Sequence, residues 1–196
     1  MAHDAAKRPA LWLVRHGETE WARLGKHTGR TDIPLTTLGR DQASGVAGRL
    51  AMHAFAVVIS SPLSRALETA RLAGFGDRVV TDDDLLEWDY GRDEGRTTPE
   101  IRTARPGWTI WGDGPAGGET IDEVAARVDR VIERARDTSG DTLAFAHGHV
   151  LRVMAARWIG QPPSEGRLFA LSTATVSVLG WEREQPVLER WNDHPD

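Results

Sequence analysis

The sequence predicts an α/β fold, a three-layer sandwich in which helices flank a central, mostly parallel sheet. The predicted strands are short apolar segments, at residues 10–14, 54–59, 78–81 and 142–146. Longer segments between most of them carry apolar residues at helical spacing. Strands that alternate with helices are typical of a parallel sheet covered on both faces. Two closing segments, 174–181 and 186–191, predict a hairpin that gives the sheet one antiparallel edge.

The first two helices are predicted by periodicity and by residues typical of helix ends. Residues 36–52 place apolar side chains roughly on one face. In the stretch "SSPLSRALETARLAG", Pro62 suits the first turn of a helix and Gly74 suits its end. We therefore expect one helix before the second strand and one directly after it.

Two more helices are predicted in the second half of the chain. Thr120 and Glu123 form a capping-box pattern, and apolar residues recur at helical spacing from there to Ala135. Another helix follows the strand 142–146 and runs to about Trp158. The tract between the two halves, residues 82–118, is charged, rich in glycine and proline, and contains three tryptophans. We expect a single domain spanning residues 1–196, with 82–118 as a lid-like insertion.

Composition excludes several classes of protein. The 196 residues carry a net charge of −5, whereas nucleic-acid binders usually have a basic surplus. There is no cysteine, which excludes disulfides and thiol chemistry, and no apolar run reaches 18 residues. The N-terminal ten residues show no signal-peptide pattern. We expect a soluble cytoplasmic protein with no nucleic-acid or membrane partner. Its oligomeric state stays open, with a homodimer as one alternative.

Residues with catalytic side chains follow three of the predicted strands. The first strand runs into Arg15 and His16, the second into Ser61 with Arg65 one helical turn further on, and 142–146 into His147. In open α/β sheets ligands bind beyond the carboxyl ends of the strands, so these side chains are predicted to share one pocket. Two guanidinium groups, two imidazoles and nearby helix N-termini form a receptor for a phosphate dianion.

Each of these residues alone also has a structural explanation. Arg15 and His16 are compatible with a surface turn, Arg65 with an exposed position on a helix, and His147 with a histidine that holds a turn. The functional interpretation rests on their joint occurrence, each directly after an apolar strand.

Four stretches carry a resemblance to a known family: "LVRHGETEW", "SSPLSRALETA", "LLEWDYGRDEGRT" and "FAHGHVLR". Together they resemble the histidine phosphatase superfamily, also called the phosphoglycerate-mutase-like family, from about residue 10 to residue 180. The resemblance implies that His16 is the nucleophile that becomes a phosphohistidine. It implies that Arg15, Arg65 and His147 hold the phosphate and that Glu87 donates a proton to the leaving group.

Further candidates lie beside these motifs. In "GKHTGRTDIPLT", the residues Lys26, His27, Thr28 and Arg30 could reach the mouth of the pocket, and Thr28 and Gly29 are predicted to bind substrate. The alternative is a solvated loop that is only structurally necessary. His147 and His149 form an "HGH" pair, but no matching carboxylate-histidine set accompanies it, so we expect no metal and no cofactor.

Secondary candidates are given structural roles. We expect the lid aromatics, including Trp88, Tyr90 and Trp111, to pack more often than to stack on substrate. Glu18 and Thr19 are expected to serve turn hydrogen bonding, and Arg152 to serve structure or a carboxylate pair.

The predicted function is a metal-independent phosphomonoesterase for small phosphorylated metabolites, which releases inorganic phosphate. The motifs are similar to broad-specificity acid phosphatases and to sugar bisphosphatases. A phosphoglycerate mutase is the alternative, although Ala22 stands where the mutases usually have asparagine. A non-catalytic phospho-ligand-binding protein is a further alternative. Arg92 and Asp93 depart from the family pattern and leave the substrate open.

Overall fold

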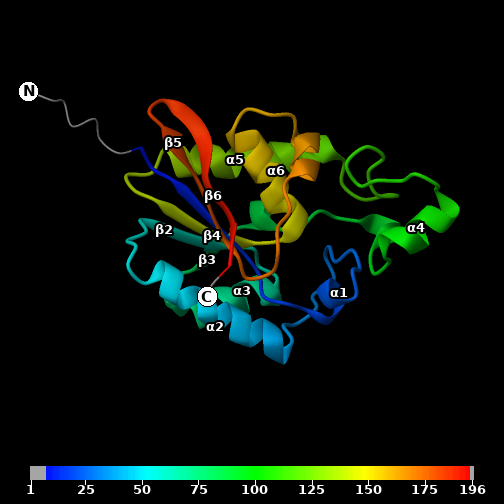
Figure 1. Cartoon of the computed structure of the whole chain (residues 1–196), viewed down its shortest axis with the longest axis horizontal. Helices are drawn as coiled ribbons and strands as arrows, with labels where there is room; N and C mark the ends of the chain where they lie inside the picture. Colours follow the sequence, from blue (N-terminus) through cyan, green and yellow to red (C-terminus); the bar gives the residue numbers. More distant parts are fainter. Residues whose placement is uncertain (1–7, 195–196) are drawn as a thin grey trace, which may run out of the picture.

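The computed structural model describes residues 8–194, which form a six-stranded sheet in the order β3-β2-β4-β1-β5-β6 (Figure 1). Neighbouring strands from β3 to β1 pair in parallel, whereas β5 pairs antiparallel with β1 and β6 antiparallel with β5. The strands are β1 (Leu11–Arg15), β2 (Val57–Ser60), β3 (Val80–Thr81), β4 (Thr142–Ala146), β5 (Val176–Glu182) and β6 (Gln185–Asp193). The mostly parallel sheet and the closing hairpin are therefore confirmed.

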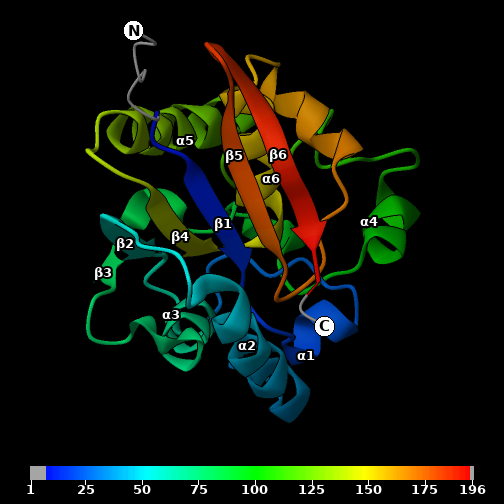
Figure 2. The same ribbon diagram turned by 60° about the vertical axis from the view of Figure 1, so that its left-hand side comes forward.

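Helices cover both faces of the sheet, as Figures 1 and 2 show. The helices α5 and α6 lie on one face, and α2 and α3 lie on the other. Each face has its own cluster of buried apolar side chains, to which the sheet contributes from both sides. The helices are α1 (Glu20–Arg23), α2 (Thr37–Leu50), α3 (Ser64–Ala70), α4 (Thr98–Ala104), α5 (Ile121–Arg136) and α6 (Gly148–Trp158).

The central strand β4 explains why the layers form. All five of its residues are buried, which is typical of a parallel strand covered on both faces. The long helix α5 begins where its capping box predicts, because the side chains of Thr120 and Glu123 each accept a hydrogen bond from the other residue's backbone N–H. These local signals account for the agreement between the predicted and observed elements in this half.

Several predicted boundaries differ from the structure, among them those of the second strand and of the helix after it. The second strand starts at Val57 rather than at residue 54, because only residues 57–60 pair with β4. Pro62 precedes the helix instead of lying in its first turn, since α3 begins at Ser64 with Leu63 as its N-cap. Gly74 does end the helical segment, where its φ of 92° is accessible to glycine at little cost.

The 82–118 segment contains a helix that the sequence analysis did not predict. The helix α4 starts at a second capping box, formed by Thr97 and Glu100, with a proline in its first turn. That signal was present in the sequence but was outweighed by the glycines and prolines around it. The buried residues Trp88, Tyr90 and Trp108 belong to the same apolar cluster as β1, α5 and α6. The segment thus shares the core of the sheet.

Within residues 8–194, no helix combines the length and the apolar character needed to cross a membrane. The expectation that the N-terminus carries no signal peptide concerns mainly residues 1–7, which lie outside the described part of the chain.

Two glycines let the first turn of α2 pack directly against the backbone that follows β1. A Cβ added at Gly17 would lie 2.2 Å from the carbonyl oxygen of Gly39, and one added at Gly39 would lie 2.1 Å from the carbonyl oxygen of Glu18. Both distances are far below van der Waals contact, and the obstacle in each case is backbone. This close approach fixes the residues on either side of Gly17, including His16.

We predict that Gly39→Ala destabilises the fold and that Gly48→Ala, in the same helix, stabilises it. The added methyl group at residue 39 meets backbone, so the free energy of unfolding should fall by about 1–3 kcal/mol. At residue 48 the space is open, and the helix propensity of alanine should raise it by about 0.5–1 kcal/mol. Urea unfolding of both variants measures the difference. Equal changes in the two variants would contradict the close packing at Gly39.

Candidate active site

Three strand ends meet at one edge of the sheet. The strands β1, β4 and β2 are neighbours and parallel, so their carboxyl ends deliver His16, His147 and Ser61 to the same place. The backbone N–H of His16 donates to the carbonyl of Ala146 at 3.0 Å, and the rings of His16 and His147 are 5.1 Å apart. The convergence predicted from the strand ends is therefore observed for these residues.

His16 is buried and held in one tautomer. Its Nδ1 lies 2.7 Å from the carbonyl oxygen of Gly17, which can only accept, so Nδ1 carries the proton. Nε2 is then unprotonated and free to act as a nucleophile. Burial, and after it the charges of Arg65 and Arg15, hold the pKa of His16 well below its ordinary value, so the ring is neutral at pH 7.

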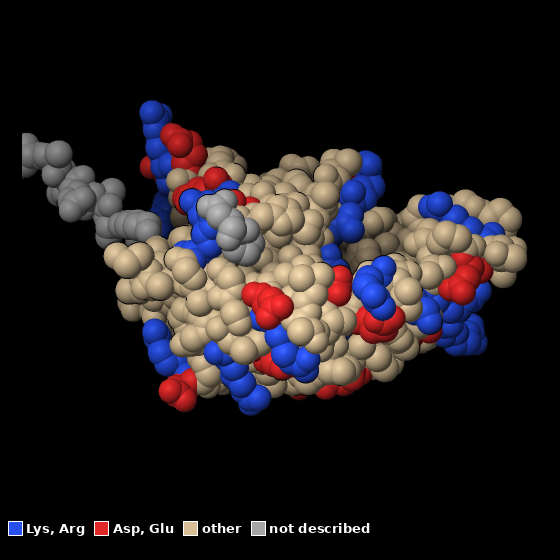
Figure 3. Space-filling model, turned by 60° about the horizontal axis from the view of Figure 1, so that its bottom comes forward, with Lys and Arg blue, Asp and Glu red and all other residues tan. Residues whose placement is uncertain are grey.

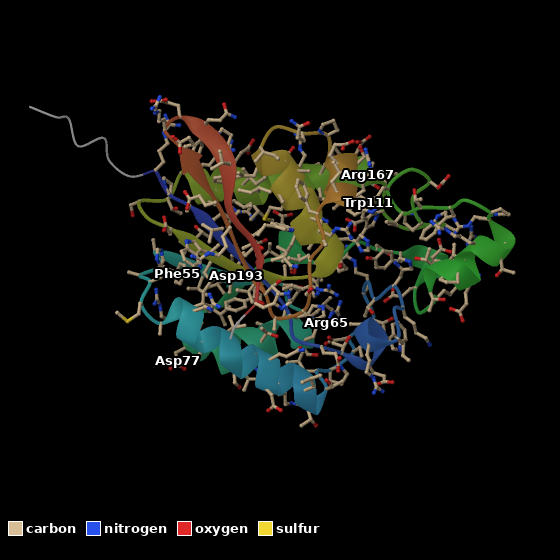
Figure 4. The ribbon with its side chains drawn as sticks, in the orientation of Figure 1. Phe55, Arg65, Asp77, Trp111, Arg167 and Asp193 are labelled. Atoms are coloured by element: carbon tan, nitrogen blue, oxygen red, sulfur yellow. The ribbon has the colours of Figure 1, made fainter. Side chains whose placement is uncertain are left out.

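Arg65 is fully buried, and most of its contacts are backbone carbonyl oxygens. Its terminal nitrogens donate to the carbonyls of Gly29 at 2.9 Å and Thr31 at 3.0 Å. Asp32 is 3.8 Å away and half-exposed, so water screens its charge. Figure 4 shows Arg65, a residue of α3, below Trp111 in that view. Among residues 8–194, no buried carboxylate forms an ion pair with Arg65.

Arg15 supplies a second, half-buried cation. One terminal nitrogen donates to the carbonyl oxygen of Leu171, and among the described residues its Nε has no hydrogen-bond partner. Burial lowers the pKa of Arg15, while the negative charge of Glu87 raises it. A guanidinium with an unused donor is a receptor for an anion, because its N–H groups match the oxygens of a phosphate.

His147 is fully buried, and both its ring nitrogens are engaged. Its Nδ1 accepts from Nε of Arg65 at 3.2 Å, so Nε2 carries the proton and donates to the hydroxyl of Ser61 at 2.7 Å. Burial, followed by the charge of Arg65, holds its pKa well below the ordinary value. Since both nitrogens are occupied, the "HGH" pair is not arranged as metal ligands. Within residues 8–194 no group of three or more histidine, aspartate or glutamate side chains is placed to hold a metal ion.

Glu87 lies at the N-terminus of α6. One carboxylate oxygen accepts hydrogen bonds from the backbone N–H of Trp88 and of Val150, both at 2.9 Å. The other accepts from the N–H of His149 at 3.0 Å. The first-turn N–H groups of a helix are otherwise unpaired, so α6 positions this carboxylate as part of its own capping.

Arg15, His16 and Glu87 open into a pocket of about 190 Å³. Figure 3 shows the surface hollowed between the body of the molecule and the part that carries α4, with Lys and Arg side chains near the rim. The other lining residues are Ala22, Gly25, Lys26, His27, Thr28, Tyr90, Gly148, His149, Arg152 and Leu171. Arg65 and His147 lie behind this wall, fully buried. The arrangement offers a neutral imidazole, guanidinium donors and a carboxylate to one small ligand.

A comparison with known families decides the assignment. The family model for the histidine phosphatase superfamily, branch 1, matches residues 11–194. The chain belongs to this superfamily. The family and the fold that the four motifs predict are thereby confirmed.

Two curated relatives of this histidine phosphatase are named as phosphatases, and others are named as probable phosphoglycerate mutases. The acid phosphatase of Mycobacterium tuberculosis is 44% identical over 177 residues, which are 88% of this chain and 86% of that protein. The sedoheptulose 1,7-bisphosphatase of Saccharomyces cerevisiae is 36% identical over 184 residues, 78% of this chain and 68% of that protein. The solved structure of the product of an M. tuberculosis open reading frame superimposes with a TM-score of 0.92 at 38% identity, covering 96% of this chain and 99% of that one. The chain is a phosphatase of this superfamily.

The loop at residues 25–36 of this histidine phosphatase contributes only in part to the pocket. Lys26, His27 and Thr28 line it, as expected, but Gly29 and Arg30 do not. The N–H of Gly29 donates to Glu94, and its carbonyl accepts from Arg65. Arg30 lies 3.4 Å from Glu119. The carbonyl of Gly29 thus supports Arg65, which lies behind the pocket wall. The orientation of Gly29 is set by contacts that the sequence does not show.

The two departures from the family pattern have different positions. Arg92 is exposed and lies outside the pocket lining. Asp93 is buried, bonds with the N–H of Ala116 and pairs with Arg105 and Arg96. Asp93 therefore holds the 82–118 segment together and does not contact the site.

The residues given structural roles divide between packing and the pocket wall. Trp88 is fully buried, and Trp111 packs on the guanidinium of Arg152 at 4.7 Å. Thr19 caps the N–H of Ala22, and Glu18 accepts from the hydroxyl of Thr36. The placements of Trp88, Trp111, Thr19 and Glu18 agree with the structural roles expected of them.

Sequence reasoning missed Tyr90, His149 and Arg152 as pocket residues. The N-cap position of His147 puts His149 and Arg152 three residues apart in the first turns of α6 and therefore on one face. That spacing was a usable signal. Tyr90 carried none, because its place depends on how the 82–118 segment folds over α6. The side chain of Arg152 donates to the carbonyls of Gly166 and Arg167, so the expected carboxylate pair is replaced by backbone oxygens.

The neutral histidines make the stability of this histidine phosphatase fall at mildly acidic pH. Burial lowers the pKa of His16, His147 and His149 well below about 6.5, the value in the unfolded chain. As pH falls through 6.5 the unfolded chain takes up protons that the folded chain does not, so the free energy of unfolding falls.

We therefore predict a loss on the order of 3 kcal/mol between pH 7.5 and pH 5.5, about 1 kcal/mol per histidine. Urea unfolding at both pH values, without phosphate, measures it. His149→Gln removes one titrating ring and should lower the pH dependence by about a third. Stability that stays constant or rises on acidification would show that these rings are protonated in the fold.

Proposed function

We propose that this chain is a metal-independent phosphomonoesterase that hydrolyses small phosphorylated metabolites through a phosphohistidine at His16. The observation that carries the proposal is the tautomer of His16. The Gly17 carbonyl holds the proton on Nδ1, and burial, followed by the surrounding guanidinium charges, keeps the ring neutral. A neutral imidazole with a free Nε2 is a competent nucleophile, whereas a protonated ring is not.

The first step transfers the phosphoryl group to the enzyme. Nε2 of His16 forms a bond to phosphorus as the bond between phosphorus and the ester oxygen breaks. Arg15 and Arg65 neutralise the non-bridging oxygens, and His147 is placed to add a donor if its Nε2–H turns from Ser61 to the phosphate. Glu87, protonated at this stage, gives its proton to the departing oxygen.

The second step releases inorganic phosphate. Water attacks phosphorus from the side that the leaving group has vacated, and Glu87, now a carboxylate, accepts a proton from it. The bond between Nε2 and phosphorus breaks, and His16 returns to its neutral state. The position of Glu87, fixed by three backbone N–H groups at the pocket wall, supports both roles.

Arginine side chains can provide the charge that a metal ion provides in other phosphatases. Arg65 is buried and Arg15 half-buried, and after burial the charges of both lower the pKa of His16. A pocket of about 190 Å³ suits a small phosphate ester. The names of the relatives, an acid phosphatase and a sugar bisphosphatase, support the same substrate class.

Phosphoglycerate mutase is the second candidate. Ala22 lines the pocket and carries no amide to bind the substrate of a mutase, which favours hydrolysis. A non-catalytic phosphate binder is the third candidate. It would need the arginines but neither the unprotonated nucleophile nor Glu87, so it accounts for less of the site.

We predict that the wild-type chain hydrolyses an aryl phosphate in the presence of a chelator and that His16→Ala abolishes turnover. Rapid quenching in alkaline denaturant, which preserves phosphohistidine, should recover the labelled phosphoryl group on His16. His194→Ala, at an exposed position, is the matched control. Exchange of phosphoglycerate isomers that depends on a bisphosphate primer would point instead to a mutase. A phosphate-dependent rise in Tm without turnover would point to a binder.

We predict that Glu87→Gln lowers the hydrolysis of alkyl phosphates by roughly 10²–10⁴-fold, the usual contribution of a positioned acid. The loss should shrink for nitrophenyl phosphate, whose leaving group departs without a proton. Because the glutamine amide would face the N–H of His149, Tm and phosphate binding must show that the variant still folds. Equal losses for good and poor leaving groups would rule out the acid role.

A further inference from the structure

A tyrosine and a histidine are joined in the pocket wall, and the proposed mechanism uses neither side chain. The hydroxyl of Tyr90 lies 2.6 Å from Nδ1 of His149, and both residues line the pocket. Tyr90 is buried, whereas His149 is partly exposed toward the pocket. They come from different elements, Tyr90 from the 82–118 segment and His149 from the first turn of α6.

The environments of Tyr90 and His149 determine which of their atoms carry protons. Burial raises the pKa of Tyr90 well above its ordinary value, and burial followed by the charge of Arg152 holds the pKa of His149 well below its own. A protonated phenol beside a neutral imidazole donates to the bare ring nitrogen, so Nδ1 accepts and Nε2 carries the hydrogen. Within residues 8–194, this Nε2 has no hydrogen-bond partner, although His149 is a pocket residue.

The ring of His149 is also held in place by packing. The ring of Trp111 lies 5.2 Å from it, and that of His27 lies 6.0 Å from it. The backbone N–H of the same residue donates to Glu87 at 3.0 Å. His149 therefore lies next to Glu87, the proposed proton donor to the leaving group, and lines the same pocket.

We propose that His149 is a specificity-determining residue whose Nε2–H donates a hydrogen bond to an oxygen on the leaving group. Tyr90 is its positioning residue. The site would then favour phosphate esters of polyols and sugars, which carry a hydroxyl next to the ester carbon, over alkyl phosphates that lack one. An enzyme site that hydrogen-bonds a substrate hydroxyl discriminates against the analogue without it. This inference rests on the proposed phosphatase function.

The test compares two substrates that differ in one hydroxyl, n-propyl phosphate and 2-hydroxypropyl phosphate. In the wild type, kcat/KM should be roughly three- to tenfold higher for the hydroxylated ester, the effect of one neutral hydrogen bond. His149→Leu should reduce that ratio to about one. His149→Gln keeps an N–H donor and should retain part of it. Arg92→Ala, at the exposed position outside the pocket, is the control and should leave the ratio unchanged.

The role of Tyr90 is tested by measuring which tautomer the ring of His149 adopts. Nitrogen NMR of ¹⁵N-histidine-labelled protein should show the Nε2–H form of His149 in the wild type. Tyr90→Phe should populate the Nδ1–H form and lower the preference for the hydroxylated ester, an effect that a purely structural role for Tyr90 would not produce.

The outcomes separate this inference from the function on which it rests. If the wild type hydrolyses neither ester nor an aryl phosphate, the proposed function fails, and the inference fails with it. If it hydrolyses them but His149→Leu leaves the ratio unchanged, only the inference is overturned. An Nδ1–H tautomer of His149 in the wild type would also overturn it. Should the leucine variant not fold, the glutamine variant and the tautomer still decide.

Discussion

The guanidinium of Arg65 joins three separate parts of the chain, and the rest of the site depends on it. Arg65 lies in α3, donates to the carbonyls of Gly29 and Thr31, and donates through Nε to His147 at the end of β4. One planar group thus sets the position of a loop, the tautomer of an imidazole and the charge around His16. The neighbouring loop has no carboxylate that could replace the carbonyl contacts at comparable distance, since Asp32 is 3.8 Å away and half-exposed.

Carbonyl oxygens hold an arginine without cancelling its charge. A buried carboxylate would pair with Arg65 and remove the positive potential that a phosphate needs, whereas backbone dipoles and a neutral imidazole leave most of it in place. Burial is the main reason why His16 stays neutral, and the same field adds to it, because a protonated ring next to two cations would be repelled. A chain with a net charge of −5 can therefore still build a local anion receptor.

The sequence was sufficient to predict the parts of the site that follow from strand ends. His16, Ser61 and His147 come directly after parallel strands, and the topology alone brings them together. Gly29 was misplaced, because a loop residue next to a predicted binder can point its carbonyl either way, and here it points to Arg65. The direction in which a loop residue faces depends on contacts with distant parts of the chain. Here the Glu94 carboxylate accepts a hydrogen bond from the N–H of Gly29.

The wall on the leaving-group side was the least predictable part, for a physical reason. The 82–118 segment, which carries Tyr90, is followed directly by Glu119, and Glu119 links this part of the chain to distant elements. Glu119 forms an ion pair with Arg127 of α5 at 2.9 Å and lies 3.4 Å from Arg30 of the loop at residues 25–36. The indole N–H of Trp88 donates to the carbonyl of Glu119 at 2.8 Å.

The phosphate end of the pocket and the opposite wall are built from different parts of the chain, and this affects how substrates are distinguished. Residues at the strand ends form the phosphate end of the pocket. Their positions follow from the sheet and do not depend on the leaving group. The opposite wall includes Tyr90, whose segment shares the core of the sheet through Trp88 and Tyr90. A hydrogen-bond donor on a mobile loop would lose much of its selectivity to the entropy of ordering it. A donor such as His149, fixed between Tyr90 and Trp111, avoids that loss and can distinguish leaving groups by a single oxygen.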